Sequence, residues 1–252
     1  MTGRRDHPVL QAEGVAKSYG GRKILENVSI SLGPGELVCL VGVSGAGKTT
    51  LFNILSGLER PDGGRVLLNG RDVTGAPGQV SYMLQRDLLL PHKKVLDNAA
   101  LPLVIRGMKK REARAEAASY FPRFGLEGTE DKYPAQLSGG MRQRAALLRT
   151  FLGSREAALL DEPFSALDAL TKREIHQWYL GMMDQLRMAA LFITHDIDEA
   201  ILLSDRVCVL SGRPGRVAAE LTIRPPRPRD PSFPVSGEFL DYKKRILSLL
   251  EA

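Results

Sequence analysis

A glycine-rich stretch, GVSGAGKTT at residues 42–50, combines three glycines with one lysine and two threonines. The glycines let backbone N–H groups approach a phosphate closely, and Lys48 adds a cation that can reach the same oxygens. The Thr49 hydroxyl suits Mg²⁺, which keeps several waters and takes few protein ligands. The stretch matches G-x-x-x-x-G-K-[ST] and lies between an apolar run and a helical pattern, the context that this motif requires. It therefore predicts nucleotide binding rather than a plain glycine turn with a surface lysine.

Two adjacent carboxylates follow a second apolar run, in AALLDEP. Asp161 comes after four apolar residues, so we expect it at the carboxyl end of a buried strand, where parallel sheets bind ligands. An unpartnered charge there is costly, and Asp161 is predicted to contact Mg²⁺ through water. Glu162 can polarise an attacking water, or it can merely end the strand. We favour the catalytic role, because Pro163 stops the strand there and fixes the exit of the chain.

The segment LSGGMRQR puts a serine and two glycines in front of a strongly helical pattern. Each glycine costs roughly 1 kcal/mol against alanine inside a helix, so the pair needs a reason. Ser138 is a good helix N-cap, and Gly139 and Gly140 permit close approach of the backbone to a phosphate at the helix N-terminus. A capped helix without a ligand is the alternative, but it does not explain the second glycine. We therefore expect a second phosphate-binding segment here.

These segments, in this order, resemble the nucleotide-binding subunit of ABC transporters. Further markers of that family run along nearly the whole chain: Tyr19 in KSYGG, Gln85 in MLQRD, Asp168 in SALD and His195 in FITHD. The resemblance implies that Tyr19 stacks on adenine, which its flat ring suits, although a core tyrosine is the alternative. It also implies that Gln85 touches Mg²⁺ and the attacking water, and that His195 contacts the γ-phosphate. Asp168 would belong to a loop that crosses a dimer interface.

The resemblance further implies an ATPase that holds ATP and Mg²⁺ between two copies of the chain. The nucleotide-binding residues of the first segment are Gly42, Ser44, Gly45, Gly47, Lys48, Thr49 and Thr50. The predicted catalytic residues are Glu162, His195, Gln85 and Lys48, and the predicted metal ligands are Thr49, Gln85 and Asp161. The serine and two glycines of LSGG in the partner copy would close over the γ-phosphate, so hydrolysis would require dimer closure.

Longer sequence segments indicate which type of ABC transporter this chain resembles. LQRDLLLPHKKVLDNAALPL, DEPFSALDALTK and LSGRPGRV resemble the ATPases of importers for nitrate, sulfonates, taurine and thiamine-pyrimidine precursors. This resemblance implies a homodimer, peripheral on the cytoplasmic face of the inner membrane, bound to a permease that receives a small solute from an extracytoplasmic binding protein. An exporter or lipoprotein-release ATPase is one alternative. An ABC ATPase acting on nucleic acid is another, but the chain has no long insertion between its motifs, and we expect no nucleic-acid partner.

The elements that must position these residues alternate between strands and helices. Residues 9–33 alternate apolar and polar side chains, which predicts antiparallel strands, whereas the later strands are short apolar runs typical of a buried parallel sheet. The predicted fold class is α/β, and the resemblance implies a P-loop NTPase of the ABC-ATPase type, with a parallel core sheet, an antiparallel β flank and a helical subdomain at about residues 86–155. We expect the ATPase domain over residues 1–222. A Pro/Arg-rich linker and a docking amphipathic helix would follow at 223–252.

The composition is that of an ordinary globular protein. Of the 252 residues, 43% are hydrophobic and 25% are charged, and no apolar run approaches the ~18 residues of a membrane span. The charged N-terminus lacks the apolar core of a secretory signal. Cys39 and Cys208 lie in separate apolar runs, which favours two buried, reduced thiols over a disulfide or a zinc site. The net charge of +6 permits an anionic partner without requiring one, and we interpret the arginines of residues 213–229 as part of a solvated linker.

Overall fold

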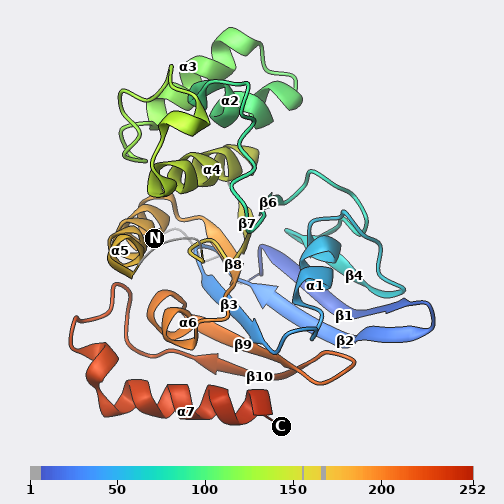
Figure 1. The fold of residues 1–252 in the computed structure, drawn as a ribbon. Coiled ribbons are helices and arrows are strands. Elements are labelled where there is room, and N and C mark those ends of the chain that lie inside the picture. The colour runs from blue at the N-terminus through green and yellow to red at the C-terminus, as the bar shows by residue number, and fades with distance from the viewer. Residues whose placement is uncertain (1–6, 155, 166–168, 252) are drawn as a thin grey trace.

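The protein folds around two β-sheets, as Figure 1 shows for the computed structural model, which describes residues 7–154, 156–165 and 169–251. The larger sheet has the strand order β10-β9-β3-β8-β7-β6, and all its neighbouring strands are parallel except β9 and β10. Its strands are β3 (Leu37–Gly42), β6 (Ser81–Met83), β7 (Ala157–Asp161), β8 (Ala189–Ile193), β9 (Arg206–Ser211) and β10 (Arg216–Thr222). This is the parallel core sheet that the short apolar runs predict.

A four-stranded antiparallel sheet flanks the core sheet, in the order β2-β1-β4-β5. Its strands are β1 (Leu10–Tyr19), β2 (Arg22–Leu32), β4 (Gly63–Leu68) and β5 (Arg71–Asp72). Leu10, Ala12 and Val15 of β1 are buried, whereas the other side chains of the strand are partly or fully accessible. One face of this sheet thus packs on the core and the other meets solvent, which explains the alternating pattern of the sequence.

The core sheet is buried on both faces. Along β3, alternate side chains enter two different hydrophobic clusters: Leu37, Cys39 and Val41 lie in one, and Val38 and Leu40 lie in the other. Helices that contribute to these clusters include α1 (Lys48–Leu55), α5 (Ala169–Leu186), α6 (Ile197–Leu203) and α7 (Gly237–Glu251), besides helices of the lobe described below. Because both faces are covered, the strands carry continuous apolar runs instead of alternating ones.

Both cysteines are buried and free, as the sequence predicts. Cys39 lies on β3 and Cys208 on β9, neighbouring strands of the core sheet. Burial raises the pKa of each thiol, because the apolar surroundings disfavour the thiolate. These side chains therefore act as small apolar core residues.

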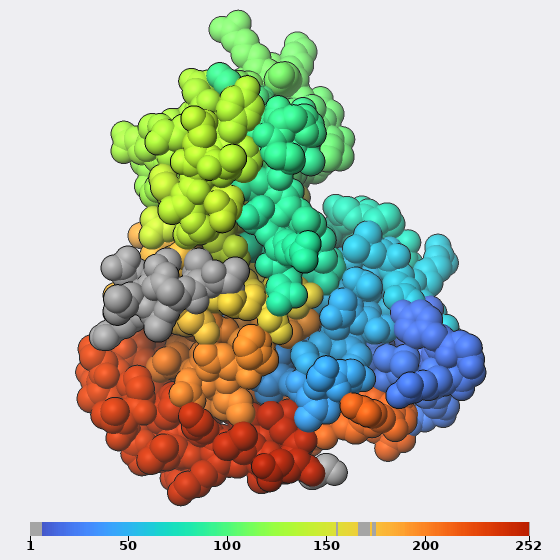
Figure 2. All heavy atoms as spheres, in the orientation of Figure 1, coloured from blue at the N-terminus to red at the C-terminus, as the bar shows by residue number. Residues whose placement is uncertain are grey.

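A lobe of helices projects from the two sheets (Figure 1), and Figure 2 shows it as a protrusion from the body of the molecule. Its elements are α2 (Val95–Ile105), α3 (Lys110–Tyr120), the 3-10 helix η1 (Pro134–Gln136) and α4 (Gly139–Gly153). Helix α2 packs against both α3 and α4, and α4 also packs against β6 of the core sheet. The helical subdomain expected at residues 86–155 covers these elements, and its boundaries stay a prediction. In the part of the chain that the structure describes, no helix has both the length and the apolar character needed to cross a membrane.

The arginines near the C-terminus hold the chain to the core. Arg227 donates two hydrogen bonds to Asp205, from Nε to Oδ1 at 2.7 Å and from Nη2 to Oδ2 at 2.9 Å, and its side chain is only 8% exposed. Arg229 donates to the carbonyl oxygen of Ser204. The interpretation of this segment as a solvated linker is therefore wrong for both arginines. The carboxylate and carbonyl just before β9 supply acceptors that let two guanidinium groups be buried.

After a 3-10 helix η2 (Phe233–Val235), α7 lies where the amphipathic pattern predicts a helix, along one side of the sheet (Figure 1). Phe239 and Ile246, two helical turns apart, are buried in the hydrophobic cluster that lies on this face. Phe233 packs edge-on against Phe239, with ring centroids 5.5 Å apart. The helix therefore docks on the core sheet rather than extending away from it.

Candidate active site

The glycine-rich loop at the end of β3 adopts a conformation that only glycine fits. Gly47 has a φ of 94°, in the left-handed region, and a Cβ there would lie 2.6 Å from Cδ2 of Leu25. Gly47 is also the N-cap of α1, without a side-chain hydrogen bond to the first turn. The first N–H groups of α1 are thus left for an external anion at the positive end of the helix. This is the local arrangement that phosphate binding requires.

The side chain of Lys48 is hydrogen-bonded to the backbone of its own loop. Its ammonium group donates hydrogen bonds to the carbonyl oxygens of Gly42 at 2.7 Å and Val43 at 3.1 Å. Burial lowers the pKa of Lys48, although the negative charges of Glu162 and Asp161 act in the opposite direction. A partly desolvated cation held by two neutral carbonyls gains strongly from an anion, so Lys48 is poised to bind phosphate oxygens.

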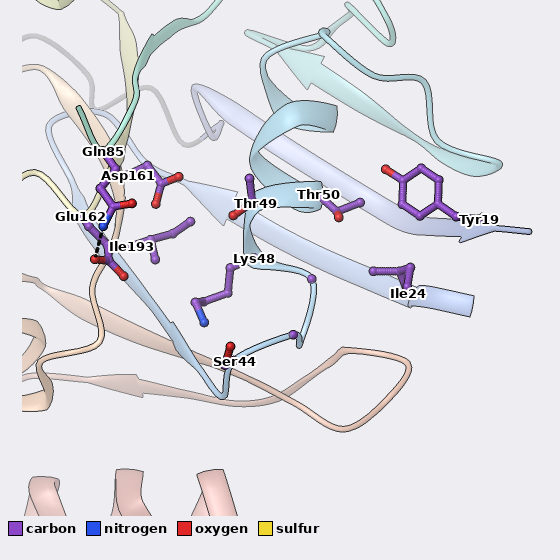
Figure 3. Close-up of a pocket in the computed structure, with 12 residues that line it drawn as sticks. Tyr19, Ile24, Ser44, Lys48, Thr49, Thr50, Gln85, Asp161, Glu162 and Ile193 are labelled. Atoms are coloured by element: carbon purple, nitrogen blue, oxygen red, sulfur yellow. Dashed lines mark hydrogen bonds between the residues drawn. The ribbon is translucent and has the colours of Figure 1, made fainter. Parts of the chain in front are cut away.

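The loop forms one side of a cavity of about 430 Å³ (Figure 3). Its lining residues are Tyr19, Ile24, Ser44, Gly45, Gly47, Lys48, Thr49, Thr50, Gln85, Asp161, Glu162 and Ile193. They come from β1, β2, the glycine loop, α1 and the carboxyl ends of β7 and β8, besides Gln85 after β6. The structure therefore brings most of the site residues predicted from sequence around one cavity of a size typical for small-molecule ligands.

The predicted metal ligands fit Mg²⁺. Thr49, Gln85 and Asp161 all line the cavity (Figure 3), and they offer a hydroxyl, an amide and a carboxylate oxygen. Burial raises the pKa of Asp161 because it disfavours the charged carboxylate, and the neighbouring negative charge of Glu162 raises it further. A divalent cation would relieve this repulsion. The described residues contain no cluster of three His, Cys, Asp or Glu side chains suited to a metal.

Glu162 is contacted from two sides at the edge of this cavity. Gln85 donates a hydrogen bond from Nε2 to Oε2 of Glu162 at 3.0 Å (Figure 3), and Nδ1 of His195 lies 3.2 Å from Oε1. The His195 side chain is 69% exposed, which does not fit the structural role that a lone histidine most often has. Three of the four predicted catalytic side chains, Glu162, Gln85 and His195, thus form one connected group.

Tyr19 stands at the end of β1 and is 47% exposed, so it is not the core tyrosine of the alternative interpretation. Its hydroxyl donates to Oε1 of Glu59, and the ammonium of Lys17 lies 5.4 Å from the ring centroid. Burial of the hydroxyl and its bond to Glu59 raise the pKa of Tyr19. An accessible ring that is anchored at its tip offers a flat face to a purine base.

The LSGG segment lies elsewhere. Ser138 caps α4, and its Oγ accepts a hydrogen bond from the N–H of Met141 at 3.2 Å, as expected for an N-cap serine. Ser138 and Gly139 are exposed and Gly140 is half-buried. Gly139 lines a second hollow of about 870 Å³, which also reaches Gln85, Glu162 and His195. The segment thus faces outward and does not line the glycine-loop cavity of its own chain.

One predicted residue, Asp168, lies outside the described residues.

The sequence does not predict some side chains that contact the site. Arg213, in the turn between β9 and β10, donates a hydrogen bond to the carbonyl of Ser44 at 3.2 Å. Gln143 of α4 donates to the carbonyl of Pro163, directly after Glu162. Neither contact has a local signal, because each joins segments far apart in the sequence.

The fold and the site define a P-loop ATPase. A comparison with protein families identifies the ABC transporter family, whose profile matches residues 25–165, and the chain belongs to this family. The predicted family, the α/β ABC-ATPase fold and ATP hydrolysis as the enzymatic activity are thereby confirmed.

Three curated relatives match most of the chain. The formylaminopyrimidine import ATP-binding protein ThiZ of Halalkalibacterium halodurans is 42% identical over 245 residues, 96% of each chain. The aliphatic sulfonates import ATP-binding protein SsuB 2 of Burkholderia cenocepacia is 41% identical over 223 residues, 88% of this chain and 81% of the relative. The nitrate import ATP-binding protein NrtD of Synechocystis sp. is 37% identical over 232 residues, 90% and 87% of the two chains.

Solved structures agree with this assignment. The bacterial ABC transporter cassette MJ0796 was solved as a dimer and also as a post-hydrolysis dimer bound to ADP and Pi. The two structures have TM-scores of 0.73 and 0.72 and are 28% and 29% identical, and each match covers 85% of this chain and 99% of the other.

Proposed function

We propose that this chain is the ATP-hydrolysing subunit of an ABC importer, working as a homodimer on a membrane permease. The observation that carries the chemistry is the meeting of Lys48, Asp161 and Glu162 around one cavity with Gln85. The import role rests on relatives at 37–42% identity, whose names all describe import ATP-binding proteins.

The residues of one chain divide the work of hydrolysis. The glycine loop and Lys48 bind the phosphates, and Tyr19 stacks on the adenine base. Mg²⁺, held by Thr49, Asp161 and Gln85, would neutralise charge on the β- and γ-phosphates. Glu162 accepts a proton from the attacking water.

Two side chains orient that step. Gln85 and His195 contact opposite oxygens of Glu162 and keep its carboxylate directed at the cavity edge. Such positioning is a main contribution to phosphoryl transfer, where the protein performs little covalent chemistry.

The second copy completes the site. Ser138, Gly139 and Gly140 are at least partly exposed and do not line the ATP cavity of their own chain, so their phosphate-binding geometry is available to a partner. Dimeric structures among the relatives support this arrangement. Closure of the dimer would then place the N-terminus of α4 of one copy over the γ-phosphate held by the other.

We propose the ATPase domain at residues 1–222, the helical subdomain at about 86–155 and the tail at 223–252.

The permease would bind the assembly at the cytoplasmic face of the plasma membrane, with this subunit peripheral to the membrane. An extracytoplasmic binding protein would deliver the solute, which we place in the sulfonate, taurine, nitrate or pyrimidine-precursor class. The three relatives name different solutes, so the choice among them needs transport data.

The test combines a trapped variant with transport. Glu162→Gln keeps the shape of the side chain but cannot accept a proton, so the variant should bind ATP, stop turning over and accumulate as a dimer in size-exclusion chromatography. Glu156→Gln is the control and should behave as wild type, because Glu156 directly precedes the first residue of β7 whereas Glu162 follows the last one. Undiminished turnover in Glu162→Gln would overturn the catalytic assignment. Uptake of candidate solutes by a strain lacking this chain, with and without complementation, tests the import role.

A further inference from the structure

A cluster of four charged or ionisable side chains joins α5 to the start of α6, outside the residues that line the ATP cavity. We refer to Lys172, His176, Asp196 and Glu199 as the α5–α6 cluster. Oε1 of Glu199 lies 2.8 Å from Nε2 of His176 and 3.1 Å from the ammonium of Lys172. The Glu199 side chain is only 3% exposed, so its carboxylate depends on these partners. No motif in the sequence points to this group.

Glu199 carries its charge inside the protein. Burial favours the protonated form, but hydrogen bonds from His176 and Thr194, with the charges of His176 and Lys172, outweigh burial and hold the pKa of Glu199 below its ordinary value. A buried charge of this kind adds little stability compared with well-packed apolar side chains. Its value lies in the fixed geometry that the paired groups impose on their surroundings.

The cluster fixes the backbone on both sides of His195. Asp196, the next residue, accepts a hydrogen bond from Lys172 at 2.8 Å, and its other oxygen accepts from the N–H of Glu199 at 3.2 Å as the N-cap of α6. The N–H of Asp196 in turn donates to Oγ1 of Thr194 at 3.1 Å. His195 therefore stands exposed between two residues that are held in place.

The cluster also touches the segment that carries Glu162. Phe164, two residues further along, is 2% exposed and packs edge-on against His176 with ring centroids 4.6 Å apart. Its ring also meets Tyr179 of α5 at 5.3 Å. His176 thus contacts Phe164 on one side and Glu199 on the other, and it bridges the two segments whose side chains, Glu162 and His195, meet at 3.2 Å.

We propose that Lys172, His176 and Glu199 are positioning residues for ATP hydrolysis, which hold the His195 segment in register with the Glu162 segment. They do not touch the nucleotide. They act through the loop that carries His195 and through Phe164. Loss of any one of them shifts His195 relative to Glu162 and slows the chemical step, while the phosphate-binding loop is unaffected.

The first experiment measures steady-state ATPase kinetics and thermal unfolding of the full chain. Lys172→Met should lower kcat at least about tenfold, since small misplacements in a site have large effects on rate. It should leave KM for ATP within error of wild type when assayed well below its Tm, which should fall because the buried Glu199 loses one of its cationic partners. Lys172→Arg should restore most of the rate. Lys243→Met is the matched control. It removes an ion pair of 2.6 Å between Lys243 of α7 and Asp198 of α6, the helix that carries Glu199, without touching the cluster.

A raised KM with unchanged kcat, or an equal loss in Lys243→Met, would overturn the proposal. The second experiment separates positioning from general destabilisation by using single-turnover rates in the His195→Ala background. If the cluster acts through His195, Lys172→Met causes no further loss of rate when His195 is already alanine. Additive losses in the double variant would mean that Lys172 acts elsewhere, and the positioning role would be rejected.

Discussion

Nδ1 of His195 lies 3.2 Å from Oε1 of Glu162, and this contact joins the carboxyl ends of two neighbouring strands, β7 and β8. Glu162 has a φ of 46°, in the left-handed region that residues other than glycine rarely adopt. Such a conformation persists only where several contacts impose it. Here the N–H of Glu162 donates to the carbonyl of Ile193 at 3.0 Å, and Gln85 holds the side chain. The backbone is thus bent to direct one carboxylate toward the cavity.

Replacing His195 tests the first consequence of this contact. His195→Ala should lower kcat by about 10²-fold, the usual contribution of a well-placed polar catalytic group. ATP affinity should change less than about twofold, because the glycine loop and Lys48 supply most of the binding. ATPase assays and equilibrium binding of a fluorescent ATP analogue measure the two quantities. His92→Ala, an exposed histidine away from the cavity, serves as the control. A variant that binds ATP poorly but turns over normally would contradict the assignment.

The glycine loop gives a second prediction. Gly47→Ala places a Cβ 2.6 Å from Leu25 in a backbone conformation that strains any L side chain, so the loop must shift. We expect the free energy of unfolding to fall by at least about 1 kcal/mol and nucleotide binding to be lost. Gly70→Ala is the matched control, since Gly70 also has a positive φ of 77° but has no atom within 4 Å of an added Cβ. Calorimetry of both variants with and without ATP checks this. Equal loss of binding in both would show that backbone strain alone is responsible.

Asp161 gives a prediction about pH. Its pKa is raised in the folded chain by burial and by the charge of Glu162, so folding favours the protonated form. The contribution to stability is therefore fully present below the ordinary pKa of an aspartate and is lost as pH rises through the raised value. Asp161→Asn, which has no charge to bury, should raise Tm of the nucleotide-free protein at pH 7, by about 2–4 °C.

The same substitution should have no such benefit at a pH below the titration of the carboxyl group. It should also abolish ATP hydrolysis. Thermal unfolding across pH 3–8 measures the difference between variant and wild type. The interpretation fails if Asp161→Asn is destabilising at neutral pH without nucleotide. In the presence of ATP and Mg²⁺ the wild type should be the more stable form, since ligand binding favours the folded state.

Much of the site could be predicted because its residues lie in short local patterns. The glycine spacing before Lys48 dictates a loop and a helix start, and an acid after an apolar run dictates a strand end, as found for Asp161. Position along the chain is then enough to place these side chains at one edge of the sheet. The antiparallel flank was equally accessible, because alternation along one strand reports directly which face is buried.

The contacts that sequence reasoning could not reach join segments that are distant in the chain. Gln85 and Glu162 are 77 residues apart, and their hydrogen bond depends on β6 and β7 being neighbours. The α5–α6 cluster depends on how two helices pack on the sheet. Arg227 departs from the sequence prediction for the same reason, because a run of arginines and prolines is usually solvated. The acceptor that buries it, Asp205, lies on a separate segment.

The tail carries the last prediction. Arg227→Ala removes a buried cation from Asp205, whose Oδ2 also accepts a hydrogen bond from the N–H of Leu37 at the start of β3 at 2.8 Å. The loss of two charge-assisted hydrogen bonds should lower the free energy of unfolding by about 2–3 kcal/mol. Arg224→Ala, an exposed arginine of the same segment, should change it by less than about 0.5 kcal/mol.

Denaturant titration of both variants measures this difference. Removal of residues 225–252 should destabilise the chain further, because it uncovers the core surface against which Phe239 and Ile246 pack. At temperatures where Arg227→Ala stays folded, its ATP affinity should equal that of wild type, since the residue lies outside the ATP cavity. A variant of normal stability with impaired ATP binding would instead place the tail in the nucleotide site.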